Sequence, residues 1–264
     1  MAKLTLYQVD AFTDHLFGGN PAAVCPLVEW LPDQTMQNIA MENNLSETAF
    51  FIKEGDQFHI RWFTPLAEVD LCGHATLASA HVIFHLLDRK ESEIRFRSRS
   101  GILVVSREKD LLTLNFPSDE LSAVEPPPFL IESLGIHPVE IYQGKTDYLV
   151  VVGSQEEVEQ LDPDFGLMNK SDCRGVIVTA KGSEVDFVSR FFAPRVGVNE
   201  DPVTGSAHTT LIPYWSKKLG KSEMRAIQLS KRKGHLWCKF LGDRVEISGK
   251  AVIYLEGEII LDNY

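Results

Sequence analysis

Two stretches of sequence decide the fold: residues 61–76, RWFTPLAEVDLCGHAT, and residues 190–208, RFFAPRVGVNEDPVTGSAH. Each begins as an aromatic strand that stops at a proline, and each ends in a glycine and small residues that open a helix. The spacing between the two copies is typical of a duplicated domain and is too long for a solenoid repeat. The chain is therefore predicted to consist of two related halves with a cleft along their pseudo-two-fold axis.

Length and composition describe an ordinary globular protein. The 264 residues suffice for one large domain or for two of about 130 residues each. The hydrophobic fraction is 44% and the charged fraction 24%, which excludes disorder, collagen-like repeats and extended coiled coil. Asp and Glu outnumber Lys and Arg by 37 to 26, and the net charge of −11 opposes binding to nucleic acid or to an anionic membrane. No nucleic-acid or membrane partner is expected, and the short basic run at residues 231–233 is interpreted as a solvated turn.

The sequence shows no sign of export. Its first residues, MAKLTLYQVDAF, lack the basic and apolar regions of a signal peptide, and no stretch reaches the roughly 18 apolar residues of a membrane span. The cysteines form no C-x-x-C pair; they are Cys25, Cys72, Cys173 and Cys238. We therefore expect a cytoplasmic protein with reduced thiols.

Both halves follow the same order of elements. In the first half, the sequence predicts strands near residues 4–12, 49–52 and 59–63 and an amphipathic helix before residue 43. It also predicts a second helix from Gly73, whose residues are small or apolar on every face. In the second half, it predicts strands near 148–152, 176–179 and 185–192, a helix over 204–219, and short strands that include 245–247 and 251–255. A proline cluster at 126–128 marks the boundary. The predicted domains are residues 1–118, with the segment near 255–264 as a candidate to return to them, and residues 125–255.

Each copy of the repeat places a glycine at a helix start: Gly73 precedes His74 and Ala75, and Gly205 precedes Ser206. The first backbone N–H groups of a helix lack intrahelical partners and lie at the positive end of its dipole, so such an end binds a carboxylate. If the halves face each other, two helix starts converge on one anionic ligand. The alternative is that the residues at 204–206 only cap their helix.

Five motifs run through both halves: GNP at 19–21, SETA at 46–49, FTP at 63–65, DLCGHAT at 70–76 and EDPVTGSAH at 200–208. They resemble, in the same order, the PhzF phenazine-biosynthesis-like family, relatives of diaminopimelate epimerase. The resemblance implies an α+β fold of two pseudo-symmetric diaminopimelate-epimerase-like domains, each a barrel-like mixed β-sheet around a central α-helix. It also implies an active site between the domains, a homodimer, and a reaction that needs neither a metal nor an organic cofactor.

The resemblance also implies residue roles. In the best understood member of the family, the reaction is the isomerisation of a dihydro-hydroxyanthranilate. Glu47 would be the carboxylate that transfers the proton, with His74 and Asp201 assisting it. The substrate-binding residues implied in the same way are Asn20, Gly73, Ala75, Gly205 and Ser206.

Each of the three catalytic candidates also has a plainer interpretation. A glutamate that follows a helix, as Glu47 does, is commonly solvated, although the apolar run at 49–52 can raise the pKa of a carboxylate toward neutrality. His74 taken alone is a capped helix start or a core imidazole, and a positive helix end can keep it neutral as a hydrogen-bond donor. Asp201, which precedes a proline, is typical of a turn.

Cys72 raises the question of a different mechanism. A thiol at a helix start can act as a base, as the paired cysteines of related epimerases do. The matching residue in the second half is Thr204, so racemisation by two thiols is disfavoured. Nucleotide-binding, zinc-protease and serine-hydrolase motifs are missing.

The predicted function is therefore a cofactor-independent isomerase that shifts a proton within a small carboxylate-bearing metabolite. Two alternatives stay open. One is a racemase or epimerase of an amino or hydroxy acid that uses Glu47 or Cys72 as a base. The other is a non-catalytic metabolite-binding or interaction module of the same fold.

Overall fold

The computed structural model describes residues 2–86 and 91–261, and the chain divides into two compact units. Unit 1 comprises Met1–Asn115 and Ser248–Tyr264, and unit 2 comprises Phe116–Ile247. The chain passes from unit 1 to unit 2 between Asn115 and Phe116, and the sequence places the end of the first domain at residue 118. The chain returns to unit 1 at Ser248, whereas the sequence places the end of the second domain at residue 255. The difference arises because the whole of the last strand belongs to unit 1. Residues 262–264 of the predicted returning segment lie outside the described residues.

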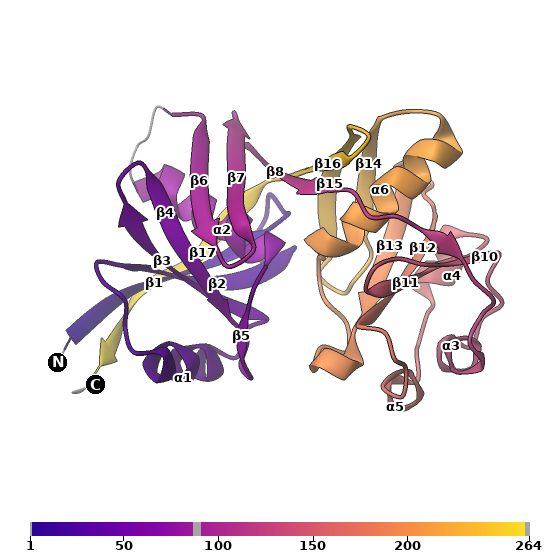
Figure 1. The fold of residues 1–264 in the computed structure, drawn as a ribbon, viewed down its shortest axis with the longest axis horizontal. Helices are drawn as coiled ribbons and strands as arrows, with labels where there is room; N and C mark the ends of the chain where they lie inside the picture. The colour runs from indigo at the N-terminus through magenta and orange to yellow at the C-terminus, as the bar shows by residue number, and fades with distance from the viewer. Residues whose placement is uncertain (1, 87–90, 262–264) are drawn as a thin grey trace. The chain divides into compact units, whose positions relative to one another are not determined.

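Unit 1 is a mixed β-sheet with two helices. Its elements are β1 (Ala2–Ala11), β2 (Asn20–Leu27), α1 (Asp33–Asn43), β3 (Glu47–Glu54), β4 (Gln57–Phe63), β5 (Glu68–Val69), α2 (Gly73–Leu86), β6 (Glu93–Ser98), β7 (Gly101–Glu108), β8 (Leu111–Pro117) and β17 (Ala251–Leu261). The strand order is β17-β1-β2-β3-β4-β6-β7-β8, with β5 beside β4 (Figure 1). The pairs β2–β3 and β4–β6 are parallel, and α1 and α2 lie in the crossovers that parallel strands require.

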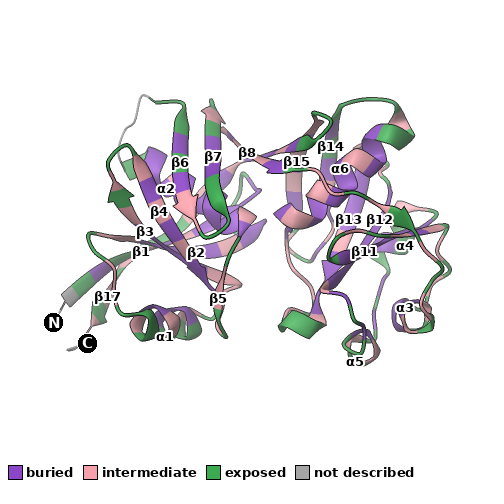
Figure 2. Ribbon diagram, viewed as in Figure 1, coloured by how far each residue is buried: buried purple, intermediate pink, exposed green. Residues whose placement is uncertain are grey.

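Helix α2 lies at the centre of unit 1. It contacts β1, β2, β3, β7 and β17, and the small residues Ala75, Ala78 and Ala80 are completely buried, which lets the strands approach closely. The helix is buried along most of its length, whereas α1 exposes its outer face (Figure 2). The apolar character on every face of α2 thus corresponds to burial on every side.

Unit 2 has the same kind of architecture. Its elements are β9 (Ser122–Ala123), α3 (Pro128–Leu134), β10 (Glu140–Gln143), β11 (Asp147–Val151), α4 (Gln155–Glu159), α5 (Phe165–Met168), β12 (Gly175–Lys181), β13 (Phe187–Phe192), the 3-10 turn η1 (Pro194–Val196), α6 (Gly205–Leu219), β14 (Glu223–Gln228), β15 (Gly234–Phe240) and β16 (Arg244–Gly249). Helix α6 contacts β11, β14 and β15, and Trp215 on this helix stacks on Phe187 with ring centroids 5.8 Å apart. None of the described helices is long and apolar enough to cross a membrane.

The duplication is visible in the strand pairing. The strands β2-β3-β4-β6-β7 pair in the order parallel, antiparallel, parallel, antiparallel, and β11-β12-β13-β14-β15 repeat that order. In both units a long helix, α2 or α6, precedes the second parallel strand. The two units therefore share one topology.

The same duplication extends to side chains. Nε of Arg61 donates to Glu68 over 2.7 Å, and its guanidinium lies 5.2 Å from the centre of the Phe63 ring. At the matching place in unit 2, Nε of Arg190 donates to Glu200 over 2.7 Å, and its guanidinium lies 4.9 Å from the Phe192 ring. In each unit, this pair ties the strand to the segment before the central helix, at β5 in unit 1 and in a loop in unit 2.

Candidate active site

Three predicted site residues come together in unit 1, each from the beginning of a different element. Asn20 is the first residue of β2, Glu47 is the first of β3, and His74 is the second of α2. The parallel strands β2 and β3 bring their starts to one edge of the sheet, because Ala22 pairs with Glu47. Helix α2 packs against both strands, so its first turn reaches the same edge.

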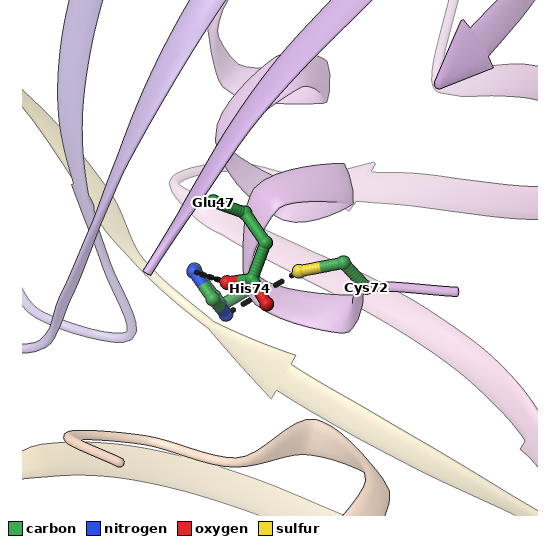
Figure 3. A group of neighbouring side chains, drawn as sticks. All are labelled: Glu47, Cys72 and His74. Carbon is green, nitrogen blue, oxygen red and sulfur yellow. Dashed lines mark hydrogen bonds and ion pairs between the residues drawn. The ribbon is translucent and has the colours of Figure 1, made fainter. Parts of the chain in front are cut away.

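Glu47 and His74 form the centre of this cluster (Figure 3). Oε2 of Glu47 lies 3.2 Å from Nε2 of His74. The other ring nitrogen, Nδ1, lies 3.2 Å from Nδ2 of Asn20 and 3.6 Å from Sγ of Cys72. The imidazole is only 6% exposed and the Glu47 side chain is 19% exposed. The ring thus lies between a carboxylate that solvent reaches and two buried neutral groups.

The surroundings of His74 decide its protonation. Burial lowers the pKa of this imidazole to about 3, so the ring is neutral at pH 7. A neutral imidazole carries one proton, and both groups beside Nδ1, the Asn20 amide and the Cys72 thiol, can donate to it. The hydrogen-bond network therefore assigns the proton to Nε2, beside the Glu47 carboxylate.

Glu47, Cys72 and His74 also form a combination that can bind a metal ion, and one donor atom from each lies within 4.8 Å of the others. The carboxylate faces Nε2, however, and the thiol faces Nδ1, so the two groups approach different nitrogens of one ring (Figure 3). A single ion would need both groups on the same nitrogen. The arrangement therefore does not suit tetrahedral coordination of one ion by all three groups.

A second cluster lies in unit 2, at the approach to α6. Oδ2 of Asp201 accepts a hydrogen bond from the Thr204 hydroxyl over 2.5 Å. The buried amide of Gln228 donates to the backbone carbonyl of Asp201 over 2.7 Å and accepts from the backbone N–H of Thr204 over 2.9 Å. Thr204 is the N-cap residue of α6, yet its side chain makes no capping hydrogen bond. The first N–H groups of the helix, at Gly205 and Ser206, therefore have no side-chain cap from Thr204, which argues against a capping role alone.

The starts of α2 and α6 are held in the same way. The Thr76 hydroxyl donates to the backbone carbonyl of Cys72 over 2.5 Å. At the matching position in unit 2, Nδ1 of His208 lies 2.8 Å from the carbonyl of Thr204. Each side chain reaches back four residues and fixes the turn from which the helix begins.

The predicted site residues fall into two groups. Asn20, Glu47, Gly73, His74 and Ala75 lie in unit 1, where Gly73 and Ala75 flank His74 in the first turn of α2. Asp201, Gly205 and Ser206 lie in unit 2, at the start of α6. Glu47, His74 and Asn20 are in direct contact, whereas Ala75 packs its methyl group in the core.

Two residues of the unit 2 cluster were missed by sequence reasoning. Gln228 holds the Asp201–Thr204 segment, and Arg174 donates from Nη2 to the Ser206 hydroxyl over 3.1 Å. Neither belongs to one of the five motifs, and no regular spacing connects either of them to its partner.

Comparison with known proteins identifies the family of this chain. The family model of phenazine biosynthesis-like proteins, PhzC-PhzF, matches residues 9–257. The chain belongs to this family. A family relative named as an uncharacterized isomerase, from Pseudomonas aeruginosa, is 53% identical over 259 residues, which cover 98% of this chain and 100% of the relative. The crystal structure of a PhzF family protein from Enterococcus faecalis superposes with a TM-score of 0.96 and 46% identity, covering 98% of this chain and 100% of that one.

More distant structures share the fold of the family. A probable proline racemase from Agrobacterium radiobacter has a TM-score of 0.65 at 8% identity, covering 98% of this chain and 93% of that one, so this likeness concerns the fold alone. The fold class is the one that the motifs predict: α+β, with two diaminopimelate-epimerase-like domains, each a mixed sheet around a central helix.

Proposed function

We propose that this PhzF family member is a cofactor-independent isomerase that moves a proton within a small carboxylate-bearing metabolite, with Glu47 as acid and base. One observation carries the proposal. The Glu47 carboxylate, which solvent reaches, lies 3.2 Å from a buried imidazole that burial keeps neutral.

The proposed step needs only the residues of this cluster. Glu47 takes a proton from a carbon that a neighbouring unsaturated or carboxylated group makes acidic, and returns it to another carbon of the same molecule. The His74 ring, whose Nε2 lies 3.2 Å from the carboxylate, limits how the carboxylate can turn. Because the pKa of His74 is about 3, the ring does not take up the transferred proton. The proton therefore stays on Glu47, within reach of the substrate.

The substrate class follows from the two helix starts. We propose that the backbone N–H groups at Gly73 in α2 and those at Gly205 and Ser206 in α6 are binding points for carboxylate groups, and that Asp201 assists the proton shift. The absence of a side-chain cap from Thr204 on α6 supports this proposal. Asn20 is proposed to act mainly through His74, because its amide lies beside Nδ1.

Solvent exchange tests the proposal. A panel of small cyclic and amino carboxylates is first screened by thermal shift, since a ligand at 100 times its Kd adds about 2.7 kcal/mol of stability. Binders are then incubated with enzyme in deuterium oxide and followed by NMR for deuterium and by chromatography for the isomer, because a shielded carboxylate can return the same proton.

The expected outcome is isomer formation by the wild type and by Glu42→Gln, a control at an exposed glutamate of α1. Glu47→Gln should bind the same ligand and form no isomer. Binding without any turnover or exchange by the wild type would favour the non-catalytic module instead.

One contact favours a racemase or epimerase as the second candidate. Sγ of Cys72 lies 3.6 Å from Nδ1 of His74, so a proton has a path between the thiol and the ring. Cys72→Ala separates the two functions. An isomerase that depends on Glu47 should keep nearly all of its activity, whereas a racemase that uses the thiol should lose exchange at the stereocentre.

A further inference from the structure

We propose that a cavity in unit 1, beside the last turns of α2, binds a phosphate group, as the free ion or as part of a small molecule. This inference goes beyond the proposed isomerase and does not depend on it. The cavity has a volume of about 440 Å³, within the roughly 300–1,000 Å³ of small-molecule sites. It is lined by the end of α2, the β7–β8 hairpin, the loop after β1 and the start of β17, all of which belong to unit 1.

The cavity is separate from the cluster of Glu47 and His74. His74 lies in the first turn of α2, whereas His81 and His85, which line the cavity, lie in its later turns. At about 1.5 Å of rise per residue, His85 lies about 16 Å further along the helix axis than His74. A ligand in the cavity therefore contacts the other end of the helix.

Positive side chains reach the cavity from two elements besides α2. Arg107 and Lys109 come from the β7–β8 hairpin, and Lys250 immediately precedes β17. Burial, together with the nearby His85, lowers the pKa of His81 to about 4, so this ring is neutral at pH 7 and can donate one hydrogen bond. This gathering of cations and donors is local, because the whole chain carries a net charge of −11.

Two carboxylates line the cavity as well, and one of them already has basic partners. Oδ2 of Asp14 lies 3.7 Å from Nζ of Lys250, and Oδ1 lies 3.2 Å from Nδ1 of His15. The other carboxylate, Asp110, follows Lys109 in the exposed hairpin turn. Three cations thus face two carboxylates, and the imidazoles of α2 add hydrogen-bond donors. The balance of the lining favours an anion.

Arg107 favours a phosphate group among the anions. Its guanidinium lies 4.2 Å from the centre of the Phe84 ring, and this packing restricts the plane of the group. A planar guanidinium beside an ammonium group matches the several oxygens of a phosphate. Leu112, Ala251 and Val252 add apolar surface to the same cavity, which gives room for an organic remainder.

The spacing of His81 and His85 also suits a transition metal, because side chains four residues apart share one face of a helix. Three cations in the same cavity oppose a metal ion, however. Within residues 2–86 and 91–261, the only cluster of three possible metal ligands is that of Glu47, Cys72 and His74, which includes neither histidine. The lining therefore favours an anion over a metal ion.

Lys109 offers a variant that removes a cation without harming the fold. Its φ is 56°, in the left-handed region that asparagine adopts more readily than lysine. Lys109→Asn should therefore leave the urea midpoint unchanged or raise it. Lys233→Asn is the matched control, because Lys233 is an exposed lysine of unit 2 with φ 53°. Both variants lose one positive charge from the same backbone conformation.

Calorimetry at constant ionic strength measures the binding of three probes: ribose 5-phosphate, inorganic phosphate and ribose. Wild type and Lys233→Asn should bind at least one of the two phosphates and should not bind ribose. Lys109→Asn should lose about 10- to 100-fold in affinity for the same phosphate, the range expected for a hydrogen bond between charged groups. The affinities of the ester and the free ion show which of the two the cavity prefers.

Histidine ring NMR locates the bound phosphate, with His85→Gln to assign one signal. The probe should shift the ring signals of His81 and His85 and leave that of His74 in place, because these rings mark different ends of α2. This measurement separates the cavity from the helix starts of the proposed active site, which also attract anions.

Three results would overturn the phosphate site: binding of neither phosphate by the wild type, equal affinities for Lys109→Asn and Lys233→Asn, or a response of the His74 ring in place of His81 and His85. Zinc binding that requires His81 and His85, without any response to phosphate, would assign the cavity to a metal ion instead. Isomerase turnover is a separate readout. Its absence would contradict the role of Glu47 and leave a phosphate site that passes these tests in place.

Discussion

The buried histidine of α6 makes unit 2 sensitive to acid in a way that can be calculated. His208 is completely buried, and Nδ1 lies 2.8 Å from the Thr204 carbonyl that it anchors. Burial lowers the pKa of His208 to about 4, against 6.5 for the unfolded chain. Between these values the unfolded chain binds a proton that the native chain does not, so stability falls as pH decreases from 6.5 to 4.

The perturbation is His208→Thr, because threonine at the matching position of unit 1, Thr76, makes the same bond to a carbonyl four residues earlier. A pH of 5 is 1.5 units below the histidine pKa of the unfolded chain, 6.5. This difference corresponds to about 2 kcal/mol of lost stability. Wild type should therefore lose about 2 kcal/mol more than His208→Thr between pH 7 and pH 5. The cavity left by the smaller side chain is present at both pH values and cancels.

Urea unfolding at the two pH values, followed by tryptophan fluorescence, measures this difference; Trp215, stacked on Phe187 beside the histidine, contributes to the signal. His137→Thr removes an exposed histidine of the same unit and serves as the control, which should follow the wild type. Equal losses for wild type and His208→Thr would refute the reasoning.

Three further substitutions test other contacts. His74→Gln removes the neutral ring that lies 3.2 Å from the Glu47 carboxylate and should lower kcat/KM by about 10- to 100-fold, with ligand affinity by calorimetry little changed. Gly19→Ala should cost at least about 2 kcal/mol in urea unfolding, because a Cβ at φ 59° would lie 2.0 Å from the carbonyl oxygen of Ala11. Gly55→Ala, at φ 61° with open space around it, is the matched control and should cost only about 1 kcal/mol. Gln228→Leu leaves the buried backbone groups that it serves unpaired, so unfolding should become easier by about 2–4 kcal/mol; an unchanged midpoint would contradict its positioning role.

Local pattern accounts for the parts of the fold that could be predicted. The small, apolar stretch after Gly73 predicts a buried helix, and the structure has α2 begin at that residue. The last strand shows the limit of this approach. The sequence predicts a strand at 251–255, but β17 continues to Leu261 because β1 pairs with it along its length, as in Leu4 with Ile259. The segment that contains Glu256 and Glu258 has the local sequence of a turn, and only its pairing with a distant strand makes it part of β17.

The residues of the candidate site that belong to short sequence motifs could be predicted from the sequence. Glu47, His74 and Asn20 were all found from short motifs, and β2, β3 and α2 bring them into contact. Gln228 and Arg174 could not be found in this way, because their contacts span 24 and 32 residues of chain. A lone glutamine at the end of a strand and a lone arginine before one look like solvated side chains until the start of α6 is placed beside them.

The central claim is that Glu47 holds the mobile proton because His74 is kept neutral. Nitrogen-15 NMR of a protein labelled at its histidine rings, with His74→Gln to assign the signal, measures this directly. We expect His74 to show a single ring proton, on Nε2, at every pH from 5 to 8. A ring that titrates near pH 6.5, or that carries both protons at pH 6, would contradict it.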